Sequence, residues 1–414
     1  MNASILTIGD EILIGSTLDS NSRAIARALV REGIHIAGMR TVADTADGIR
    51  SGVDEGLANA DVVLVTGGLG PTRDDITKQT LAEMFDSELA LDEDQLERLK
   101  KHFTRRGKDV LELNEKLAWM PVAADALPND RGTAMGMWFE RDGQVVVSMP
   151  GVPHEMEAML NDHVVPRLLE HFQVATRTHR FVMCAGMGES TIATRIDDIV
   201  DAMPEGVSIA FLPSLGQVKL RFTAGPEVDD APQVLDDIAR AVEERLPKNV
   251  YAHREVDIEE VVGEILLERG LTIGLAESCT GGYVAHRITS VPGSSRYYEG
   301  SVVTYSYRLK TEVLGVASDV LEKNGAVSEP VVEQMVRGVI DRLGVDTGIS
   351  ISGIAGPGGG LPDKPVGTVW VSVSDGERVH SHRYQLTPHR MENIRITSVV
   401  ALNQLRCLLL GLLE

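Results

Sequence analysis

The sequence DVVLVTGGLGPTRDDIT, residues 61–77, joins an unbroken apolar run to a glycine-rich turn with two adjacent acids. Residues 61–66 are rich in β-branched side chains, which favour a strand, and a continuous apolar run is typical of a strand buried on both faces. Similar runs lie at residues 4–8 and 144–149, and residues 21–31 between them have apolar positions at helical spacing. This alternation predicts an α/β domain with a parallel sheet covered on both faces.

The glycine turn after residue 66 is a candidate binding site, because ligands of open α/β sheets bind at the carboxyl ends of strands. Glycines let backbone N–H groups approach an anion, arginine pairs with phosphate, and aspartates hold divalent cations. The candidate residues are Gly67, Gly68, Arg73, Asp74, Asp75 and, after the first strand, Asp10. The alternative is a tight turn in which an aspartate caps the next helix, and the residues alone leave both interpretations open.

Two further segments follow. Residues 175–248 predict a small α+β module of order βαββα, with strands at 180–185, 207–211 and 218–223 and helices at 189–200 and 232–246. From residue 251 the pattern predicts helices at 258–266 and 332–343, strands at 271–276, 347–352 and 366–373, and a buried final helix over 407–413.

The motif AESCTGGY, residues 276–283, lies between a predicted strand and a predicted helix. Ser278 is placed at the turn, where the N–H groups of residues 279–282 are expected to point outward and offer an oxyanion hole. Lys310 is a candidate base, and Tyr305 is a candidate to relay a proton or orient that base. The alternatives are a serine that caps a helix, a solvated surface lysine, and Cys279 as a rival nucleophile.

Composition excludes several classes of function. The chain has 414 residues with 40 Lys and Arg against 61 Asp and Glu, a formal charge of -21, which disfavours nucleic-acid binding through a basic surface. The three cysteines, Cys184, Cys279 and Cys407, form no disulfide framework or CxxC pair. Without a signal peptide or a long apolar stretch, we expect a cytoplasmic protein that does not enter the membrane.

Several motifs, in order and spacing, resemble the CinA family of competence/damage-inducible proteins along nearly the whole chain. They are GDEILIG (9–15), TGGLGPTRDDIT (66–77), residues 129–133 with Gly136, MPGVPHEM (149–156), AESCTGG (276–282), VPGSS (291–295), VTYS (303–306), GAVSE (325–329), SGIAGPGGG (352–360) and KPVGTVW (364–370).

The resemblance implies a multidomain α/β fold with three parts. Residues 1–172 would form a three-layer molybdopterin-binding-like domain, residues 173–250 a small α+β KH-like linker module, and residues 251–414 an α/β amidase domain. The last domain would hydrolyse nicotinamide mononucleotide to nicotinate mononucleotide and ammonia without a cofactor. The first would cleave ADP-ribose to AMP and ribose 5-phosphate with a divalent cation, Mg, Mn or Co. The resemblance also implies a homodimer. We expect no nucleic-acid role, since the module lacks a basic GxxG loop.

The resemblance also assigns site residues. Ser278 would be the nucleophile, Lys310 its base and Tyr305 the partner of that base. The substrate-binding set would be Cys279, Thr280, Gly281, Gly282, Ser352 and Arg395, with Arg390 as the alternative arginine for the phosphate, and Gly67, Gly68 and Arg73 in the first domain. The metal ligands would be Asp74, Asp75 and Asp10.

Two other functions remain as alternatives. One is a molybdopterin-handling enzyme, in which Ser278, Tyr305 and Lys310 would have no use. The other is a non-catalytic partner in competence or DNA damage, against which the intact set of three and the charge of -21 both argue.

Overall fold

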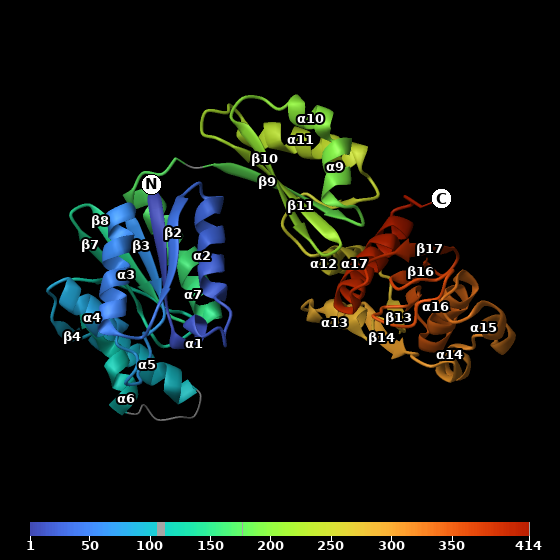
Figure 1. The fold of residues 1–414 in the computed structure, drawn as a ribbon, viewed down its shortest axis with the longest axis horizontal. Helices are drawn as coiled ribbons and strands as arrows, with labels where there is room; N and C mark the ends of the chain where they lie inside the picture. The colour runs from blue at the N-terminus through green and yellow to red at the C-terminus, as the bar shows by residue number, and fades with distance from the viewer. Residues whose placement is uncertain (106–111, 176, 414) are drawn as a thin grey trace. The chain divides into compact units, whose positions relative to one another are not determined.

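A computed structural model describes residues 1–105, 112–175 and 177–413. The chain divides into two compact units, Met1–Arg177 and Thr178–Glu414 (Figure 1). The α/β multidomain fold predicted from the sequence is confirmed. Over the described residues, no helix is long and apolar enough to cross a membrane.

The first unit is built on a six-stranded sheet of order β2-β1-β3-β8-β7-β6. The strands are β1 (Asn2–Ile8), β2 (His35–Val42), β3 (Val62–Thr66), β6 (Asp125–Leu127), β7 (Gly136–Arg141) and β8 (Gln144–Met149). The first four in the order are parallel, whereas β7 and β6 are antiparallel. The predicted strands β1, β3 and β8 are confirmed, and the expectation of a wholly parallel sheet is wrong at the β6 edge.

Alternate residues of the central strands face two separate cores. Leu64 of β3 packs in one core with Ile25 of α2 (Ser20–Arg31), whereas Val65 packs in the other with Val53 of α3 (Ala46–Asn59). Burial on both faces explains why β3 is apolar without alternation. The other elements of this unit are α1 (Asp10–Leu13), α4 (Thr77–Met84), β4 (Leu89–Leu91), α5 (Glu93–Arg105), α6 (Glu112–Glu115), β5 (Trp119–Pro121), α7 (Pro153–Met159) and α8 (Val165–His171).

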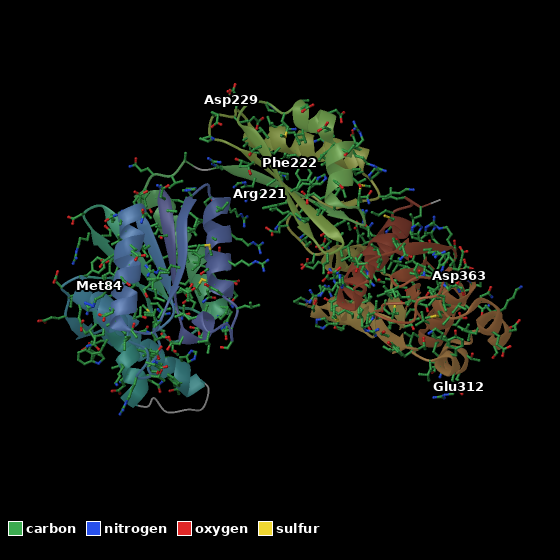
Figure 2. All side chains as sticks on the ribbon, in the orientation of Figure 1. Met84, Arg221, Phe222, Asp229, Glu312 and Asp363 are labelled. Carbon is green, nitrogen blue, oxygen red and sulfur yellow. The ribbon has the colours of Figure 1, made fainter. Side chains whose placement is uncertain are left out.

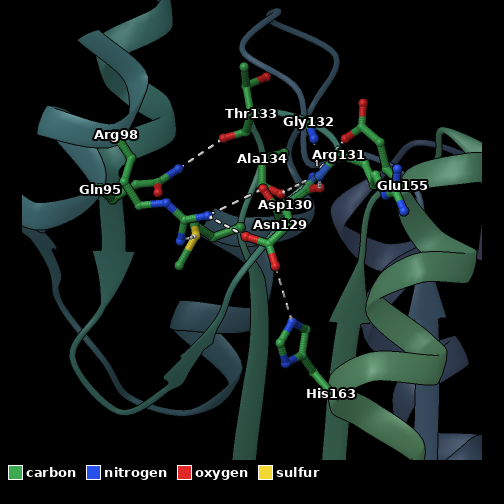
Figure 3. Close-up of polar contacts among 11 residues, drawn as sticks. Gln95, Arg98, Asn129, Asp130, Arg131, Gly132, Thr133, Ala134, Glu155 and His163 are labelled. Atoms are coloured by element: carbon green, nitrogen blue, oxygen red, sulfur yellow. Dashed lines mark hydrogen bonds and ion pairs between the residues drawn. The ribbon is translucent and has the colours of Figure 1, made fainter. Parts of the chain in front are cut away.

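A buried asparagine closes the loop before β7 (Figure 3). Asn129 donates through Nδ2 to the carbonyl of Ala134 at 2.8 Å and to Oε2 of Glu155 at 2.7 Å. Its Oδ1 accepts the N–H groups of Arg131 at 3.1 Å and Gly132 at 2.8 Å. A Cβ on Gly132 would lie 1.9 Å from the Glu155 carboxylate, so a larger residue here would displace that side chain from Asn129. The loop is thereby fixed to α7, which explains the first-domain motif at residues 129–133.

The second unit begins with the predicted βαββα module, which is confirmed. It comprises β9 (Thr178–Ala185), α9 (Glu189–Arg195), α10 (Asp197–Asp201), β10 (Val207–Ser214), β11 (Gln217–Ala224) and α11 (Ala231–Arg245), with β12 (Val250–Ala252) as a fourth strand. The sheet is antiparallel, in the order β10-β11-β9-β12. Phe222 of β11 lies in the core beneath α11, and Asp229 lies on the outer loop that follows the strand (Figure 2).

The last part of the chain forms a five-stranded sheet of order β14-β13-β15-β16-β17. Its strands are β13 (Ile273–Glu277), β14 (Tyr298–Val303), β15 (Thr347–Gly353), β16 (Thr368–Ser374) and β17 (Val379–Gln385). Its helices are α12 (Ile258–Arg269), α13 (Tyr283–Ser290), α14 (Tyr307–Leu314), α15 (Ser318–Asn324), α16 (Glu329–Leu343) and α17 (Arg390–Leu409). Strands β14, β13 and β15 are parallel, so their carboxyl ends meet at one edge.

The module and this last sheet share a core. Met183 and Tyr251 pack with residues of α12 and α17. The carbonyl of Lys248 accepts hydrogen bonds from Nδ2 of Asn403 at 2.9 Å and from Arg406 at 3.1 Å. The predicted boundary at residue 250 therefore falls inside β12, a strand of the module's sheet. The final helix predicted over residues 407–413 is confirmed only for 407–409, the buried end of α17, because the helix ends at Leu409 and Leu410 is exposed.

Candidate active site

The loop that carries Ser278 is held by a buried carboxylate. Glu277, the last residue of β13, is 1% exposed, and its side chain accepts the N–H groups of Gly282 at 3.0 Å, Val284 at 3.2 Å and Ala285 at 2.9 Å. A negative charge at the N-terminus of α13 is favourable because the first N–H groups of a helix have no partner within it. Glu277 therefore fixes the start of the helix and the loop before it.

This cap corrects part of the sequence prediction. The N–H of Gly282 is taken by Glu277, and that of Gly281 donates to the carbonyl of Ser278 at 3.1 Å, so neither points outward. In contrast, the N–H groups of Cys279 and Thr280 make no hydrogen bond to another described residue. These two are the donors that remain for an oxyanion beside Ser278.

Lys310 lies in the first turns of α14 with its ammonium group inside the domain. The residue is 1% exposed, and its Nζ lies 3.0 Å from Oγ of Ser278 and 2.5 Å from the carbonyl of Thr304. Burial lowers the pKa of Lys310 to about 8, because the charged form loses its hydration. The alternative of a solvated surface lysine is wrong, and the predicted Ser278–Lys310 pair is present in the geometry.

Tyr305 lies nearby but contacts a different residue. It is 61% exposed, and its hydroxyl oxygen accepts a hydrogen bond from Arg390 at 2.8 Å, while Arg390 also donates to the carbonyl of Gly356 at 3.0 Å. Among the described residues Tyr305 makes no hydrogen bond to Lys310, so a direct orienting contact is not seen. Asn393 donates to the carbonyl of Ala355 at 3.0 Å and thereby ties the glycine-rich loop to the start of α17.

The structure distinguishes the two candidate arginines. Arg390 is brought to Tyr305 and Gly356, whereas Arg395 lines a separate cavity with His286 of α13. The physical reason is helix geometry, because five residues turn the side chain by about 140° around the axis. Of the two arginines, Arg390 is the one beside Tyr305 and the glycine-rich loop, and which of them holds a phosphate stays a prediction.

Ser352 and Cys279 flank the nucleophile loop. The parallel register pairs Ala276 with Ser350, which places the buried Ser352 at the same sheet edge as Ser278. Cys279 packs in the core, where a Cβ on Gly353 would lie 3.0 Å from its Sγ, and burial raises its pKa to about 12. Its thiol is therefore uncharged near neutral pH, and Ser278 is the better placed nucleophile.

The glycine turn of the first unit is close-packed. A Cβ on Gly67 would lie 2.3 Å from the carbonyl oxygen of Ile8, and one on Gly68 would lie 2.2 Å from Oγ1 of Thr77. The Asp75 carboxylate accepts the N–H of Thr72 at 2.9 Å and also its hydroxyl. Asp75 thus closes the turn, and it does not cap α4, whose N-cap residue is Ile76.

An acidic cluster lies at the carboxyl ends of β1 and β2. The N–H of Asp10 donates to Oδ2 of Asp44 at 3.0 Å. Burial raises the pKa of Asp44, and the nearby charges of Asp10, Glu11 and Asp74 raise it further. The charges of Asp10 and Asp74 therefore both act on Asp44, a residue that the sequence did not indicate because the edge strand before it has no apolar run. Arg73 is exposed, and the residues that the structure describes include no group of three or more potential metal ligands.

Together these features define a class: a multidomain α/β protein whose last sheet carries a Ser–Lys pair beside free backbone donors, the arrangement used in acyl transfer. Family models match the chain in three places: "Probable molybdopterin binding domain" at residues 4–170, "Damage-inducible protein CinA KH domain" at 179–252 and "CinA C-terminal domain" at 255–409. The chain belongs to the CinA family, which confirms the resemblance seen in the sequence.

Relatives match over the full length. A CinA-like protein of Cytophaga hutchinsonii is 43% identical over 407 residues, which cover 98% of this chain and 97% of the relative. A CinA-like protein of Salinibacter ruber is 41% identical over 407 residues, which cover 98% of this chain and 99% of the relative. Among solved structures, a competence/damage inducible protein of Agrobacterium tumefaciens is 35% identical over 38% of this chain and 98% of its own, with a TM-score of 0.36.

The buried thiols give the first prediction. Burial raises the pKa of Cys184 and Cys279 to about 12 and also raises that of Cys407, so almost no thiolate exists at about pH 8. We expect an aromatic disulfide reagent to release less than about 0.1 thiol per chain within minutes from the native protein, and all three in denaturant. One fast-reacting thiol mapped to Cys279 would restore the cysteine hypothesis.

Proposed function

We propose that the last domain is a nicotinamide-nucleotide amidase, which hydrolyses nicotinamide mononucleotide to nicotinate mononucleotide and ammonia. The observation that carries this proposal is the buried Nζ of Lys310, 3.0 Å from Oγ of Ser278. An amide is a poor electrophile, so its hydrolysis needs both an activated nucleophile and stabilisation of the oxyanion. Membership of the CinA family supports the choice of substrate through the motifs that surround both residues.

The geometry suits two successive acyl-transfer steps. Neutral Lys310 accepts the proton of Ser278 as Oγ attacks the carboxamide carbon, and the N–H groups of Cys279 and Thr280 donate to the oxyanion. The protonated lysine then gives its proton to the leaving nitrogen, so ammonia departs and an acyl-serine remains. Water, deprotonated by the same lysine, attacks the ester, and the serine regains its proton. The carbonyl of Thr304, 2.5 Å from Nζ, holds the amine in place throughout.

The substrate phosphate requires a cation near this edge of the sheet. Arg390 is exposed, lies within hydrogen-bond distance of the Tyr305 hydroxyl and the Gly356 carbonyl, and presents a planar donor group suited to phosphate. Tyr305 then acts by orienting Arg390. Ser352, at the end of β15, lines the reacting side of the same edge.

Substitutions of the pair test the mechanism. Ser278→Ala removes the nucleophile, and Lys310→Met keeps the length of the side chain but removes the amine, so each is expected to lower kcat by at least about 1,000-fold. Ser278→Ala should still bind nicotinamide mononucleotide with a Kd within about threefold of wild type, because the phosphate contact is intact. Ammonia release and calorimetric binding measure the two quantities.

Matched variants separate this result from general damage. Cys279→Ala is expected to keep kcat within about fivefold, and Lys323→Met, which changes an exposed lysine of the same domain, should match wild type. Inactive Cys279→Ala together with active, folded Ser278→Ala would instead assign the chemistry to the thiol.

The pH dependence follows from the lysine. Its pKa is lowered to about 8, and only the neutral amine accepts a proton, so kcat/KM should rise with pH through about 8 and level off above it. At pH 7 we expect about a tenth of the plateau value. A profile measured from about pH 6 to 9.5 that instead falls through pH 8 would show that the protonated lysine is the active form.

We also infer a second activity for the first unit, the cation-dependent cleavage of ADP-ribose to AMP and ribose 5-phosphate. The observation that favours it is the raised pKa of Asp44 beside Asp10 and Asp74, which reports negative charge that a cation would neutralise. Carboxylate oxygens are the ligands that Mg²⁺ and Mn²⁺ prefer, and such ions are often held by one or two carboxylates together with substrate phosphates and water, so Asp10 and Asp44 would supply the protein ligands. Bound there, a cation would neutralise phosphate oxygens during hydrolysis.

The acidic cluster gives a separate prediction. Asp44→Asn and Asp10→Asn should lower metal-dependent cleavage of ADP-ribose by at least about 100-fold and leave ammonia release from nicotinamide mononucleotide unchanged. Asp47→Asn, which alters an exposed aspartate at the start of α3, is the matched control. Cleavage that resists both substitutions and a chelator would rule out the metal role, and loss of both activities would indicate misfolding.

A further inference from the structure

A cavity lies apart from the Ser278–Lys310 pair, at the junction of the module and the last domain. It has a volume of about 570 Å³ and lies between the hairpin that joins β10 to β11 and the helices α13 and α17. The hairpin contributes Ser214 and Gln217, α13 contributes Tyr283 and His286, and α17 contributes Arg395. Ligand sites favour such junctions, and this volume lies within the range of small-molecule pockets.

One side of the cavity is built from a nearly buried ion pair. Arg287 donates to Glu259 through Nε at 3.0 Å and through Nη2 at 2.5 Å, and Nη1 donates to Oγ of Ser398 at 3.1 Å. The two charged side chains are only 13% and 9% exposed. The single glutamate of the lining is therefore fully engaged by one arginine and leaves no charge to pair with another.

Arg395 supplies an uncompensated positive charge. It is exposed, and among the described residues it has no acidic partner. His286 is also exposed and lies next to Tyr283, with ring centroids 6.0 Å apart. In a chain with a formal charge of -21, a cavity with two arginines and one glutamate is a local exception.

We propose that this cavity binds a phosphate-bearing small molecule of up to mononucleotide size. Arg395 has the planar donor geometry that pairs with a phosphate group, and His286 lies on the neighbouring helix as a further donor. The ring of Tyr283 offers an apolar face to the remainder of the ligand. The hairpin residues Ser214 and Gln217 close the cavity from the module side with neutral polar groups.

The position of the cavity gives the ligand access to the catalytic elements. Helix α13 follows directly on the Ser278 loop, and α17 begins at Arg390, so a molecule bound here contacts both helices that build the proposed amidase site. This coupling rests on the proposed function, whereas the binding itself does not.

Hydrogen exchange of the full chain, read by mass spectrometry with AMP or adenosine as the probe, tests the proposal. We expect AMP, but not adenosine, to slow exchange in residues 214–217 and 283–290. Arg395→Gln should weaken AMP binding by about tenfold or more and abolish this protection. Arg296→Gln removes an exposed arginine of the same domain without an acidic partner, and it should behave as wild type.

A second variant separates the cavity from the amidase site. Arg390→Gln should retain the protection of residues 214–217, because its side chain lies on the other side of α17. Protection that is lost in Arg390→Gln but kept in Arg395→Gln would overturn the proposal and place the only anion site at Ser278. Equal protection by adenosine and AMP would also overturn it, since the phosphate would then contribute nothing. Neither readout requires amidase activity, so failure of the proposed function leaves this test intact.

Discussion

The removal of the Lys310 ammonium group from water is the constraint on which the site depends. Lowering the pKa of Lys310 from 10.5 to about 8 corresponds to a cost on the order of 3 kcal/mol for keeping it charged. Burial brings half of the amine into its neutral form near pH 8, and two neighbours keep the buried nitrogen hydrogen-bonded: the Thr304 carbonyl accepts one N–H, and Ser278 lies 3.0 Å from Nζ. Both neighbours directly follow parallel strands, β14 and β13, so the sheet itself brings the base to the nucleophile.

The same site contains a buried carboxylate, and its oxygens are engaged away from the lysine. A carboxylate beside Nζ would favour the charged amine and raise its pKa. Glu277 is adjacent to Ser278 in sequence, yet its oxygens accept three N–H groups at the start of α13. The negative charge is thus balanced by the helix terminus and not by the lysine. One residue thereby orders the nucleophile loop and leaves its base without a counter-ion.

Elements and residues that are buried on both sides were predictable from the sequence. Strands β3 and β13 are buried along their whole length, and β15 is buried at every residue but Gly353, because helices cover both faces; the Ser278 turn directly follows β13. Edge strands were missed, since β2 and β17 are largely exposed and have no apolar run. Asp44 lies two residues after β2 and was not predicted as a site residue, because the strand before it was not predicted. The choice between Arg390 and Arg395 does not follow from a motif, because it depends on which side of α17 faces the glycine-rich loop. The same is true of the N–H groups of Gly281 and Gly282, whose acceptors are set by the conformation of the turn.

Helix α17 links the site to the module by a chain of contacts that sequence alone does not reveal. Its first residue, Arg390, contacts Tyr305, and near its other end Asn403 and Arg406 donate to the Lys248 carbonyl. Arg406 is buried, and a buried guanidinium whose acceptors are removed carries a large desolvation cost. The loop at residues 247–248 is therefore part of the support of α17. The small module thereby contributes backbone acceptors that hold the C-terminal half of α17 in place.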